Sequence, residues 1–431
     1  MPPSSLFPET PRAPVAPRSK ARQSRATGPP RPRPDGEPAA AERERSDVAV
    51  VVVEHPNQLV PYLDSWRALA ERAAEPNVFY EPAVLLPALR AFAGQRRLAL
   101  VLVIGLQPDP AGANLAAPAL WGLFPLERCA RGTELPVPCL RLWQHAYSYV
   151  PTPLVDRTHG AAVMTAFFDW LSAQALAPAL LVMNKLPVGG PFHQVLIEEL
   201  GRRRATVLVR DRGTRALLAP DCDAATYQAR SMTGKHRREL RRRHKQLASL
   251  GQLRVDELPG GDSIDGWIAE FLAIERAGWK GREGTALASN ATDARFFAEM
   301  ARAIHAAGKL SFTAVRLDGR PIAMQVTLRA GRGAFAFKLG YDETFARYSP
   351  GVLLALDLVE RVAAGRGAAW IDSCAAQDHD MVGRLWTERR SLESWVVSGG
   401  PASGLLLAAW PALAWLKRTL RIPRPASRGE S

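Results

Sequence analysis

The stretch that decides the fold covers residues 310–373 and reads LSFTAVRLDGRPIAMQVTLRAGRGAFAFKLGYDETFARYSPGVLLALDLVERVAAGRGAAWIDS. Asp318-Gly319 separates two runs of β-forming residues, which predicts a hairpin because Asp-Gly accepts the positive φ angles of a two-residue turn. A third run at 334–341 extends the hairpin to a three-stranded meander. Tyr348-Ser349-Pro350-Gly351 then opens an apolar helical pattern, and a last short strand is predicted at 368–371.

The start of this helix is the first candidate binding site. Ser349 can cap the helix, and Pro350 fits the first turn, where its missing N–H costs nothing. The free N–H groups of a helix start, together with the positive end of the helix dipole, favour an anion. A meander that leads into such a helix start is how an acyl-CoA-binding acyltransferase holds a pyrophosphate.

Six short motifs make the chain resemble a known family. They are Arg238-Glu239-Leu240-Arg241-Arg242, Gly278-Trp279-Lys280-Gly281, Asp318-Gly319-Arg320-Pro321-Ile322-Ala323, Lys338-Leu339-Gly340-Tyr341-Asp342, Tyr348-Ser349-Pro350-Gly351 and Trp370-Ile371-Asp372. In this order they resemble the CelD-type acetyltransferases of bacterial cellulose and exopolysaccharide gene clusters, a branch of the GNAT superfamily. The resemblance spans roughly residues 225–390. It implies an enzyme that moves an acyl group, most simply acetyl, from acyl-CoA to an amine or hydroxyl of a saccharide or cell-envelope precursor.

One motif departs from the usual GNAT pattern. The pyrophosphate loop has the form Arg/Gln-x-x-Gly-x-Gly/Ala, whereas Arg347-Tyr348-Ser349-Pro350-Gly351 supplies one glycine and a proline, followed by Val352. Fewer N–H groups therefore face a phosphate, because proline has none. The related FemABX-type enzymes, which resemble two fused GNAT units and take an aminoacyl-tRNA donor, stay open as an alternative. A catalytically silent scaffold that binds an anionic partner is the alternative outside enzymes.

The order of predicted elements occurs twice along the chain. In the first half, strands near 48–53 and 98–104 precede a helix near 161–173, followed by strand, helix and a strand at 206–209. The second half repeats this order from the meander to a strand at 392–397. We therefore expect an α/β protein of two tandem GNAT-like units, each a mixed sheet flanked by helices. The second unit is expected to carry the reaction and the first to shape the acceptor cleft.

The same patterns predict the domain boundaries. Residues 1–47 are rich in Pro, Arg, Ala and Ser and predict a disordered tail, because this composition cannot bury enough apolar surface to offset the entropy of ordering. Residues 48–215 are predicted to form the N-terminal GNAT-like unit and 216–400 the C-terminal acetyltransferase unit. Residues 401–431 form an apolar and basic C-terminal segment.

Composition indicates a cytoplasmic protein without a metal. Its four cysteines are widely scattered and form no CxxC pair, which favours a reducing compartment. No HxxxH or HExxH spacing suggests a metal site. The longest uncharged apolar run, 404–416, is shorter than the roughly 20 residues of a spanning helix, and the amino end lacks the apolar region of a secretory signal.

The C-terminal segment has two interpretations. Its apolar run contains two tryptophans and is followed by four arginines or lysines up to residue 424. Such a segment can lie in a membrane interface, with the tryptophans at headgroup level, or dock on the core of the protein. The first interpretation predicts a peripheral membrane contact through 404–424.

The charge of the chain is concentrated in one segment. Residues 230–245 carry eight Lys or Arg against the single acid Glu239, so they contribute 8 − 1 = +7 of the net +14. Leu240, Leu247 and Leu250 fall on one face of a predicted helix that Gly251 ends. The helix is either a solvated amphipathic helix or a clamp for CoA phosphates, tRNA, a sugar nucleotide or anionic lipid.

Acyl transfer requires a base or water chain, a donor to the oxyanion and a proton for the leaving thiolate. We take Asp342, Lys338, Tyr341, Glu275 and Asp372 as catalytic candidates, with Glu275 and Asp342 as bases. We take Arg347, Tyr348, Ser349, Gly351 and Val352 for the acyl-CoA, and Trp279 and Lys280 for the acceptor. From the sequence alone, Asp342 can equally cap a turn, Glu275 can pair with Lys280 on a helix surface, and Trp279 can belong to the core.

Overall fold

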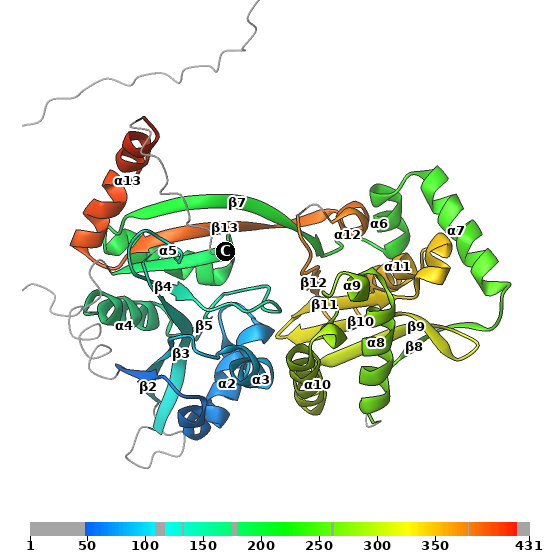
Figure 1. Ribbon diagram of the computed structural model, residues 1–431, viewed down its shortest axis with the longest axis horizontal. Helices are drawn as coiled ribbons and strands as arrows, with labels where there is room; N and C mark the ends of the chain where they lie inside the picture. The colour runs from blue at the N-terminus through cyan, green and yellow to red at the C-terminus, as the bar shows by residue number, and fades with distance from the viewer. Residues whose placement is uncertain are drawn as a thin grey trace, which may run out of the picture. The chain divides into compact units, whose positions relative to one another are not determined.

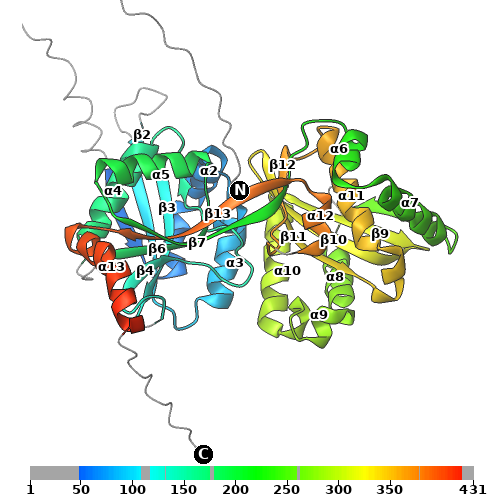
Figure 2. The ribbon, with the colours of Figure 1, turned by 90° about the horizontal axis from the view of Figure 1, so that it is seen from above.

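The computed structural model describes residues 48–107, 117–131, 133–174, 179–259, 263–377 and 379–419, so the predicted tail at 1–47 lies outside it. The strands of these residues form one mixed sheet in the order β1-β2-β3-β4-β6-β13-β7-β12-β11-β10-β9-β8, and β5 pairs with β3. Helices cover both faces of the sheet (Figures 1 and 2). The predicted α/β class with a mixed sheet flanked by helices is confirmed.

The N-terminal half of the sheet follows the predicted order of elements. Its strands are β1 (Val48–Val53), β2 (Leu98–Gln107), β3 (Ala117–Cys129), β4 (Cys139–Leu142), β5 (Leu154–Val155), β6 (Leu180–Pro187) and β7 (Val207–Leu218). Its helices are η1 (Pro56–Tyr62), α2 (Leu63–Arg72), η2 (Val78–Tyr80), α3 (Pro82–Phe92), α4 (Gly160–Ser172) and α5 (Pro191–Arg202).

The C-terminal half repeats this order after two connecting helices, α6 (Ala224–Ser231) and α7 (Gly234–Ala248). Its strands are β8 (Leu253–Glu257), β9 (Leu310–Leu317), β10 (Arg320–Ala330), β11 (Gly333–Tyr341), β12 (Trp370–Asp372) and β13 (Glu388–Ser398). Its helices are α8 (Asp265–Ala277), α9 (Trp279–Arg282), η3 (Leu287–Ser289), α10 (Ala291–Ala306), η4 (Glu343–Tyr348), α11 (Pro350–Ala363), α12 (Asp380–Leu385) and α13 (Pro401–Thr419).

The meander forms as its turn chemistry predicts. Asp318 and Gly319 adopt φ angles of 50° and 80°, and Leu317 pairs with Arg320 across this tight turn between β9 and β10. The strand β11 then pairs antiparallel with β10, with a bulge between Val326 and Thr327. The meander, the helix after it and the short strand β12 are therefore confirmed.

Strands β7 and β13 form a ribbon that both halves share. They pair antiparallel from Glu388↔Leu217 to Val397↔Val207. In the N-terminal half β13 lies between β6 and β7, while in the C-terminal half β7 lies between β12 and β13. Figures 1 and 2 both show the two strands running side by side between the two groups of strands. Each half is thus completed by the last strand of the other, although the sequence pattern assigned 392–397 to the second unit alone.

A common core joins the two halves. The described residues all belong to one compact unit, and its largest apolar cluster contains residues of both halves. Phe79 of the first half, for example, packs edge-on against Phe335 of β11, with ring centroids 5.3 Å apart. The predicted boundary between 215 and 216 stays a prediction, because strand pairing and the core both continue across it.

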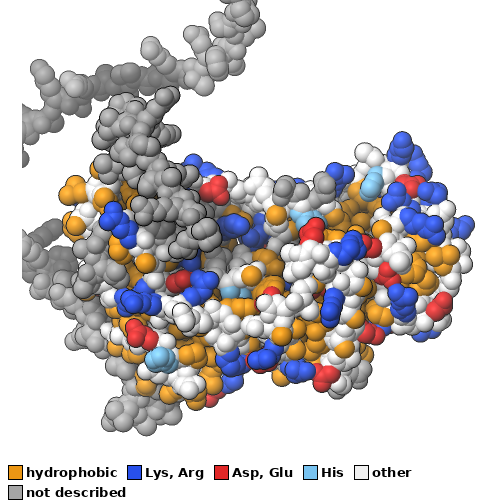
Figure 3. Space-filling view, viewed as in Figure 1, with side chains coloured by type: hydrophobic (Ala, Val, Ile, Leu, Met, Phe, Trp, Pro, Cys, Tyr) orange, Lys and Arg blue, Asp and Glu red, His pale blue; other side chains and the backbone are white. Residues whose placement is uncertain are grey.

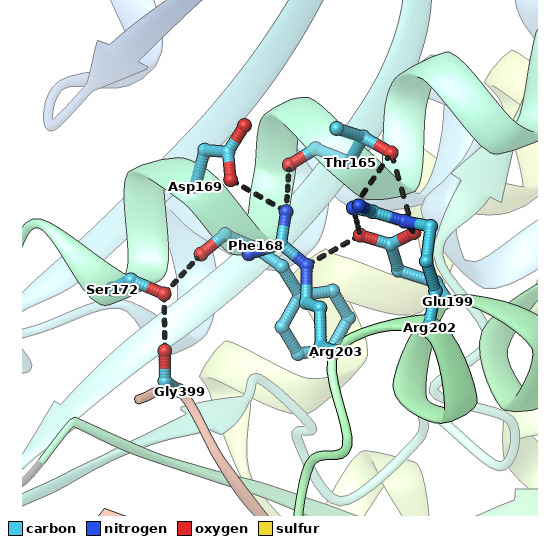
Figure 4. Close-up of polar contacts among 8 residues, drawn as sticks. All are labelled: Thr165, Phe168, Asp169, Ser172, Glu199, Arg202, Arg203 and Gly399. Atoms are coloured by element: carbon cyan, nitrogen blue, oxygen red, sulfur yellow. Dashed lines mark hydrogen bonds and ion pairs between the residues drawn. The ribbon is translucent and has the colours of Figure 1, made fainter. Parts of the chain in front are cut away.

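A polar network fixes α5 against α4 (Figure 4). Glu199 of α5 is 5% exposed and accepts hydrogen bonds from Arg202 Nη2 at 2.7 Å and from Thr165 Oγ1 of α4 at 3.2 Å. Arg203 also pairs with Glu199 and lies over the ring of Phe168, 5.7 Å from its centroid. Because these contacts are buried or half-buried, they hold the C-terminal end of α5 in a fixed place against α4.

The C-terminal helix α13 is docked on the protein where its side chains are described. Leu407 is buried in a cluster with Cys129 and Val396, whereas Leu405 is 75% exposed. Among the described residues, no helix has both the length and the apolar composition that crossing a membrane requires. The peripheral membrane contact through 404–424 stays a prediction.

Candidate functional site

The start of α11 is shaped by the turn η4. Asp342 caps η4, with its Oδ1 accepting the Thr344 N–H at 3.0 Å, and its other oxygen pairs with Arg320. Ser349 then adopts a left-handed conformation with φ 55°, which is costly for a residue with a β carbon. The predicted Ser349 cap is wrong, because its side chain makes no hydrogen bond to the backbone of α11. Ser349 instead faces α7.

The basic helix α7 lies against this helix start. Arg243 Nη1 donates to Ser349 Oγ at 3.0 Å, and the Arg347 guanidinium lies 4.7 Å from the Tyr348 ring centroid. Between them is a hollow of about 480 Å³, called here the α7–α11 hollow, lined by Glu239, Arg242, Arg243, Gln246, Ser249, Leu250, Arg347 and Tyr348. Figure 3 shows Lys and Arg side chains gathered over the part of the surface where Figure 1 places α7.

The leucine stripe of α7 explains why the helix lies there. Leu247 is buried and packs in one cluster with Tyr348 and Leu354 of α11. Leu240 is buried among side chains of α11 and α12. Leu250 does not belong to the stripe, since α7 ends at Ala248 with Ser249 as its C-cap and leaves Leu250 49% exposed. These two leucines therefore hold α7, which carries seven Lys or Arg, against α11.

Strand β11 has an open edge beside α11. It pairs with β12 only through Gly333, Ala334 and Phe335. Over residues 336–341 its only ladder partner among the described strands is β10. On the α11 side of this edge, Gly351 is buried, and a β carbon there would lie 3.3 Å from Leu339 and 3.7 Å from Met381. A glycine at 351 therefore lets the helix start approach the open edge closely.

Three of the predicted site residues meet on the other side of β11. The Glu275 carboxylate, whose side chain is 0% exposed, accepts from Lys338 Nζ at 2.8 Å and lies 3.5 Å from Lys280 Nζ. Its second oxygen accepts the Leu287 N–H at 2.9 Å. Lys280 Nζ also donates to the Leu339 carbonyl oxygen at 2.9 Å, on the open stretch of β11. We call Glu275, Lys280 and Lys338 the Glu–Lys cluster.

The electrostatics of the Glu–Lys cluster favour a proton transfer at Lys280. Burial lowers the pKa of Lys280, and the charge of Lys338 lowers it further, whereas Glu275 opposes both. Two lysines share one buried carboxylate, so one of the two ammonium groups is not fully compensated. A lysine in such a place gives up its proton more readily than an exposed lysine.

A residue that the sequence did not indicate completes the cluster. Tyr147 comes from the loop after β4 in the N-terminal half, and Lys338 Nζ lies 5.3 Å from its ring centroid. Its hydroxyl donates to Asp293 Oδ2 of α10 at 2.7 Å. Nothing near Tyr147 in the sequence marks this role, because the contact arises only when the two halves pack together. The N-terminal half thus supplies one wall of the site.

The other predicted site residues lie elsewhere. Asp342 is engaged as the η4 cap, and Tyr341 packs beside Leu339 in the cluster around Tyr348. Trp279 is 44% exposed, with the Lys280 ammonium 5.9 Å from its ring centroid. Val352 is half-buried in the first turn of α11.

Asp372 is the centre of a buried ion-pair group and does not face the Glu–Lys cluster. Its side chain is 0% exposed and pairs with Arg215 Nη1 at 3.4 Å and with Arg390 Nη1 at 2.9 Å. It also accepts the Cys374 N–H at 2.8 Å. Because Arg215 lies on β7 and Arg390 on β13, these bonds tie the shared ribbon to β12.

In the N-terminal half, a buried carboxylate lies just before the equivalent helix, α4. Asp156 is 1% exposed, and its Oδ1 accepts the N–H groups of Thr158 at 2.8 Å and His159 at 3.2 Å at the start of α4. Its other oxygen pairs with Arg72. The His159 ring stacks on Trp121 with centroids 3.8 Å apart.

No metal site is visible in the described ranges, where no group of three or more His, Cys, Asp or Glu converges.

Comparison with known proteins supports an acyltransferase. Residues 234–380 match the family model of an acetyltransferase (GNAT) domain, which includes both α7 and the Glu–Lys cluster. A comparison with curated protein sequences finds no match. The match confirms the prediction that the chain is an acyltransferase with a GNAT domain.

Several solved structures are similar to this chain. FemX is similar with a TM-score of 0.50 and 12% identity, over 78% of this chain and 95% of that chain. A tandem GNAT protein from the clavulanic acid biosynthesis pathway has a TM-score of 0.39 and 15% identity, over 82% and 99% of the two chains. L-PGS from Bacillus licheniformis has a TM-score of 0.44 and 9% identity, over 84% and 97%. At these identities the likenesses concern the fold alone.

Proposed function

We propose that the protein transfers an acyl group, most simply acetyl, from acyl-CoA to an amine or hydroxyl of a saccharide or cell-envelope precursor. The observation that carries the proposal is the bond from Arg243 to Ser349, which joins a basic helix to the start of α11. The CelD-type resemblance of the sequence supports the same acceptor class. A cytoplasmic location is part of the proposal.

The donor fits the α7–α11 hollow and the open edge of β11. The pyrophosphate would lie at the start of α11, with Arg242, Arg243 and Arg347 as counter-charges. The amide groups of the pantetheine arm can pair with the unpaired backbone of 336–341, as an added strand does. That path ends at Leu339, where Lys280 donates to the carbonyl oxygen. The thioester would therefore reach the Glu–Lys cluster.

The cluster can move the proton that the reaction releases. The acceptor oxygen or nitrogen attacks the thioester carbonyl carbon, forms the new C–O or C–N bond, and the C–S bond breaks with its electron pair leaving on sulfur. We assign Lys280, in its neutral form, to take the proton of the nucleophile and return it to the leaving thiolate. Lys338 stabilises the negative charge of the intermediate. Glu275 holds both lysines, and Tyr147 positions Lys338.

Calorimetric titration with acetyl-CoA tests the donor site. Arg243→Ala should weaken binding by roughly tenfold, since it removes one charged contact of about 1.4 kcal/mol. Arg241→Ala is the matched control, because Arg241 is exposed on the same helix and does not line the hollow. Equal affinity of the two variants would remove the α7–α11 hollow from the proposal.

A second pair of variants tests the chemistry. Lys280→Gln should bind acetyl-CoA normally and lose roughly 100-fold or more in turnover, because general acid–base catalysis contributes about that much. Arg276→Gln, exposed on the end of α8, should keep its rate. Normal turnover of Lys280→Gln would contradict the assignment.

The exposed face of α7 favours one alternative donor, aminoacyl-tRNA. Lys235, Arg238 and Arg241 are exposed and lie outside the hollow, so they are free to meet a phosphate backbone. Titration with bulk tRNA and with free CoA, parallel to acetyl-CoA, distinguishes the two donors. Tight, salt-sensitive tRNA binding without CoA binding would replace acyl-CoA as the donor.

A further inference from the structure

A second, larger hollow lies at the other end of β11, away from the Glu–Lys cluster. It has a volume of about 910 Å³ and is lined by both halves of the molecule. Gly331 and Arg332, just before β11 begins, form part of its wall, whereas the Glu–Lys cluster meets the end of that strand. The proposed acyl transfer makes no use of this space. We call it the Glu75 hollow.

One polar atom in its wall has no partner. Glu75 is 8% exposed, and its Oε2 is buried without a hydrogen bond to any described group. The cost of leaving such an oxygen unpaired is about 1–3 kcal/mol, so a buried carboxyl group of this kind calls for a ligand. Glu75 lies in the loop after α2, in the N-terminal half.

The carboxyl group lies at the start of a long helix. A β carbon on Gly190, the N-cap of α5, would be 2.5 Å from Glu75 Oε2, so only glycine permits this approach. The helix α5 has 12 residues and begins at Pro191, so the positive end of its dipole lies beside Glu75.

The rest of the wall is positively charged. The lining contains Arg157, Arg332, Arg389 and Arg390 against the acids Glu71 and Glu75. Arg390 pairs with Asp372 and lies over Trp370, 4.4 Å from the ring centroid, so its guanidinium is held rigidly. Arg332 is exposed and has no side-chain partner among the described residues. Four cations and a helix start therefore surround one carboxyl group.

We propose that the Glu75 hollow binds the carboxylate or phosphate group of a small molecule, between the start of α5 and the arginines, with Glu75 as a hydrogen-bond donor. Burial raises the pKa of Glu75, although Arg390 and the Phe192 N–H oppose the shift. A protonated carboxyl group can donate its O–H to an anion, and this explains why an acid lies among arginines. The charged groups that face Glu75 are Glu71, Arg157, Arg332, Arg389 and Arg390.

Hydrogen-exchange mass spectrometry of the full chain tests the site locally. Sulfate is the probe for phosphate groups and acetate for carboxylate groups, each against chloride at equal ionic strength. Backbone exchange of peptides covering 188–200 should slow by the factor 1 + [L]/Kd, which is about tenfold at ten times the Kd. Peptides covering 235–248 report the α7–α11 hollow separately, so the two sites succeed or fail independently.

Three variants and one control test which residues bind the anion. Arg332→Ala should weaken the protection of 188–200 by roughly tenfold, because it removes one charged contact, whereas Arg254→Ala on the edge strand β8 should not change it. Glu75→Gln keeps a donor and should bind sulfate, but its binding should no longer fall as the pH rises. Glu75→Ala should lose binding.

The proposal is overturned if neither anion protects 188–200 in the folded wild-type chain. It is equally overturned if Arg332→Ala and Glu75→Ala, shown to be folded by thermal unfolding, keep full protection. Protection by sulfate alone assigns the site to phosphate groups, and protection by acetate alone assigns it to carboxylates.

Discussion

The helices α4 and α11 occupy the same place in the two halves, yet the side chains around their starts differ. At α4, the buried carboxylate of Asp156 accepts the N–H groups of Thr158 and His159, just before the helix begins. At α11, the side chain of Ser349 leaves the backbone alone and accepts from Arg243 instead. One helix start has a buried carboxylate of the protein just before it, whereas the other is lined by cations. The second is the helix start at which we propose that the donor binds, and it stays a prediction that the second unit carries the reaction.

The largest expected effect comes from opening the α4 start. Asp156→Ala leaves Arg72 and two N–H groups without their partner, so we expect a loss of about 3–5 kcal/mol in the free energy of unfolding. Urea unfolding measures it. Asp64→Ala is the control, because Asp64 pairs with Arg67 on the surface and is 98% exposed. If both variants lose the same stability, the carboxylate does not hold the α4 start and the comparison fails.

The same residue predicts a pH dependence. Burial alone would raise the pKa of Asp156, but hydrogen bonds from Thr158, Arg72 and His159 lower it overall. A lowered pKa of an acid means that its stabilisation is complete above the unfolded pKa of about 3.9 and is lost as the pH falls further. The wild-type chain should lose this stability in acid, and Asp156→Ala should lose less.

A second acid of the N-terminal half should behave in the opposite way, with an effect on the order of 2–3 kcal/mol. Burial raises the pKa of Glu81 to about 7, although Lys309 of the C-terminal half, whose Nζ lies 2.7 Å from its Oε2, lowers it. A raised pKa means that the folded state binds more protons between pH 4.5 and about 7. Stability should therefore fall as the pH rises through this range.

Urea unfolding of Glu81→Gln at several pH values checks this sign. The variant should show a flatter profile than the wild-type chain between pH 4.5 and 7, because the group that titrates is gone. An unchanged profile would mean that another group titrates there. The result also bears on the comparison of the two halves, because Glu81 pairs with a lysine of the C-terminal half, whereas the partners of Asp156 all lie in the N-terminal half.

The smallest expected effect concerns the contribution of the first half to the site of the second. Tyr147→Phe keeps the ring over Lys338 and removes only the bond to Asp293, so we expect a loss of about 1 kcal/mol or less in stability. Turnover should stay within a few-fold, and the pH profile of kcat should not move. Tyr147→Ala removes the ring and should shift that profile. If the two variants have the same profile, Tyr147 does not position Lys338.

Local chemistry made much of this fold predictable. The Asp318-Gly319 turn, the Pro350 helix start and the apolar runs act over a few residues, so the meander and α11 follow from the sequence. The cap at Ser349 was wrong because α7, which arrives from more than 100 residues away, supplies a better partner. Strand pairing across the halves was not predictable, since apolar alternation does not say which strand lies beside which.

In the candidate site, too, the features that depend on local sequence were predictable and those that depend on long-range packing were not. Glu275 was singled out as a candidate base, and Lys280 and Lys338 lie in two of the sequence motifs; the structure brings the three together. Tyr147 and Asp293 were not predicted as site residues, because their roles depend on the packing of one half against the other. Asp372 was taken for a cleft residue, yet Arg215 and Arg390 of the shared ribbon neutralise it.

The shared ribbon has a consequence for how the chain is made. β13 must enter the sheet between β6 and β7, which are synthesised about two hundred residues earlier. A protein domain usually folds as its segment leaves the ribosome. Here the first half cannot close its sheet until the last strand emerges, so β6 and β7 must wait with unpaired edges. Closing such a long loop is slow, and exposed edges invite aggregation. Because the two halves exchange their final strands, we expect this chain to depend on chaperones during its synthesis.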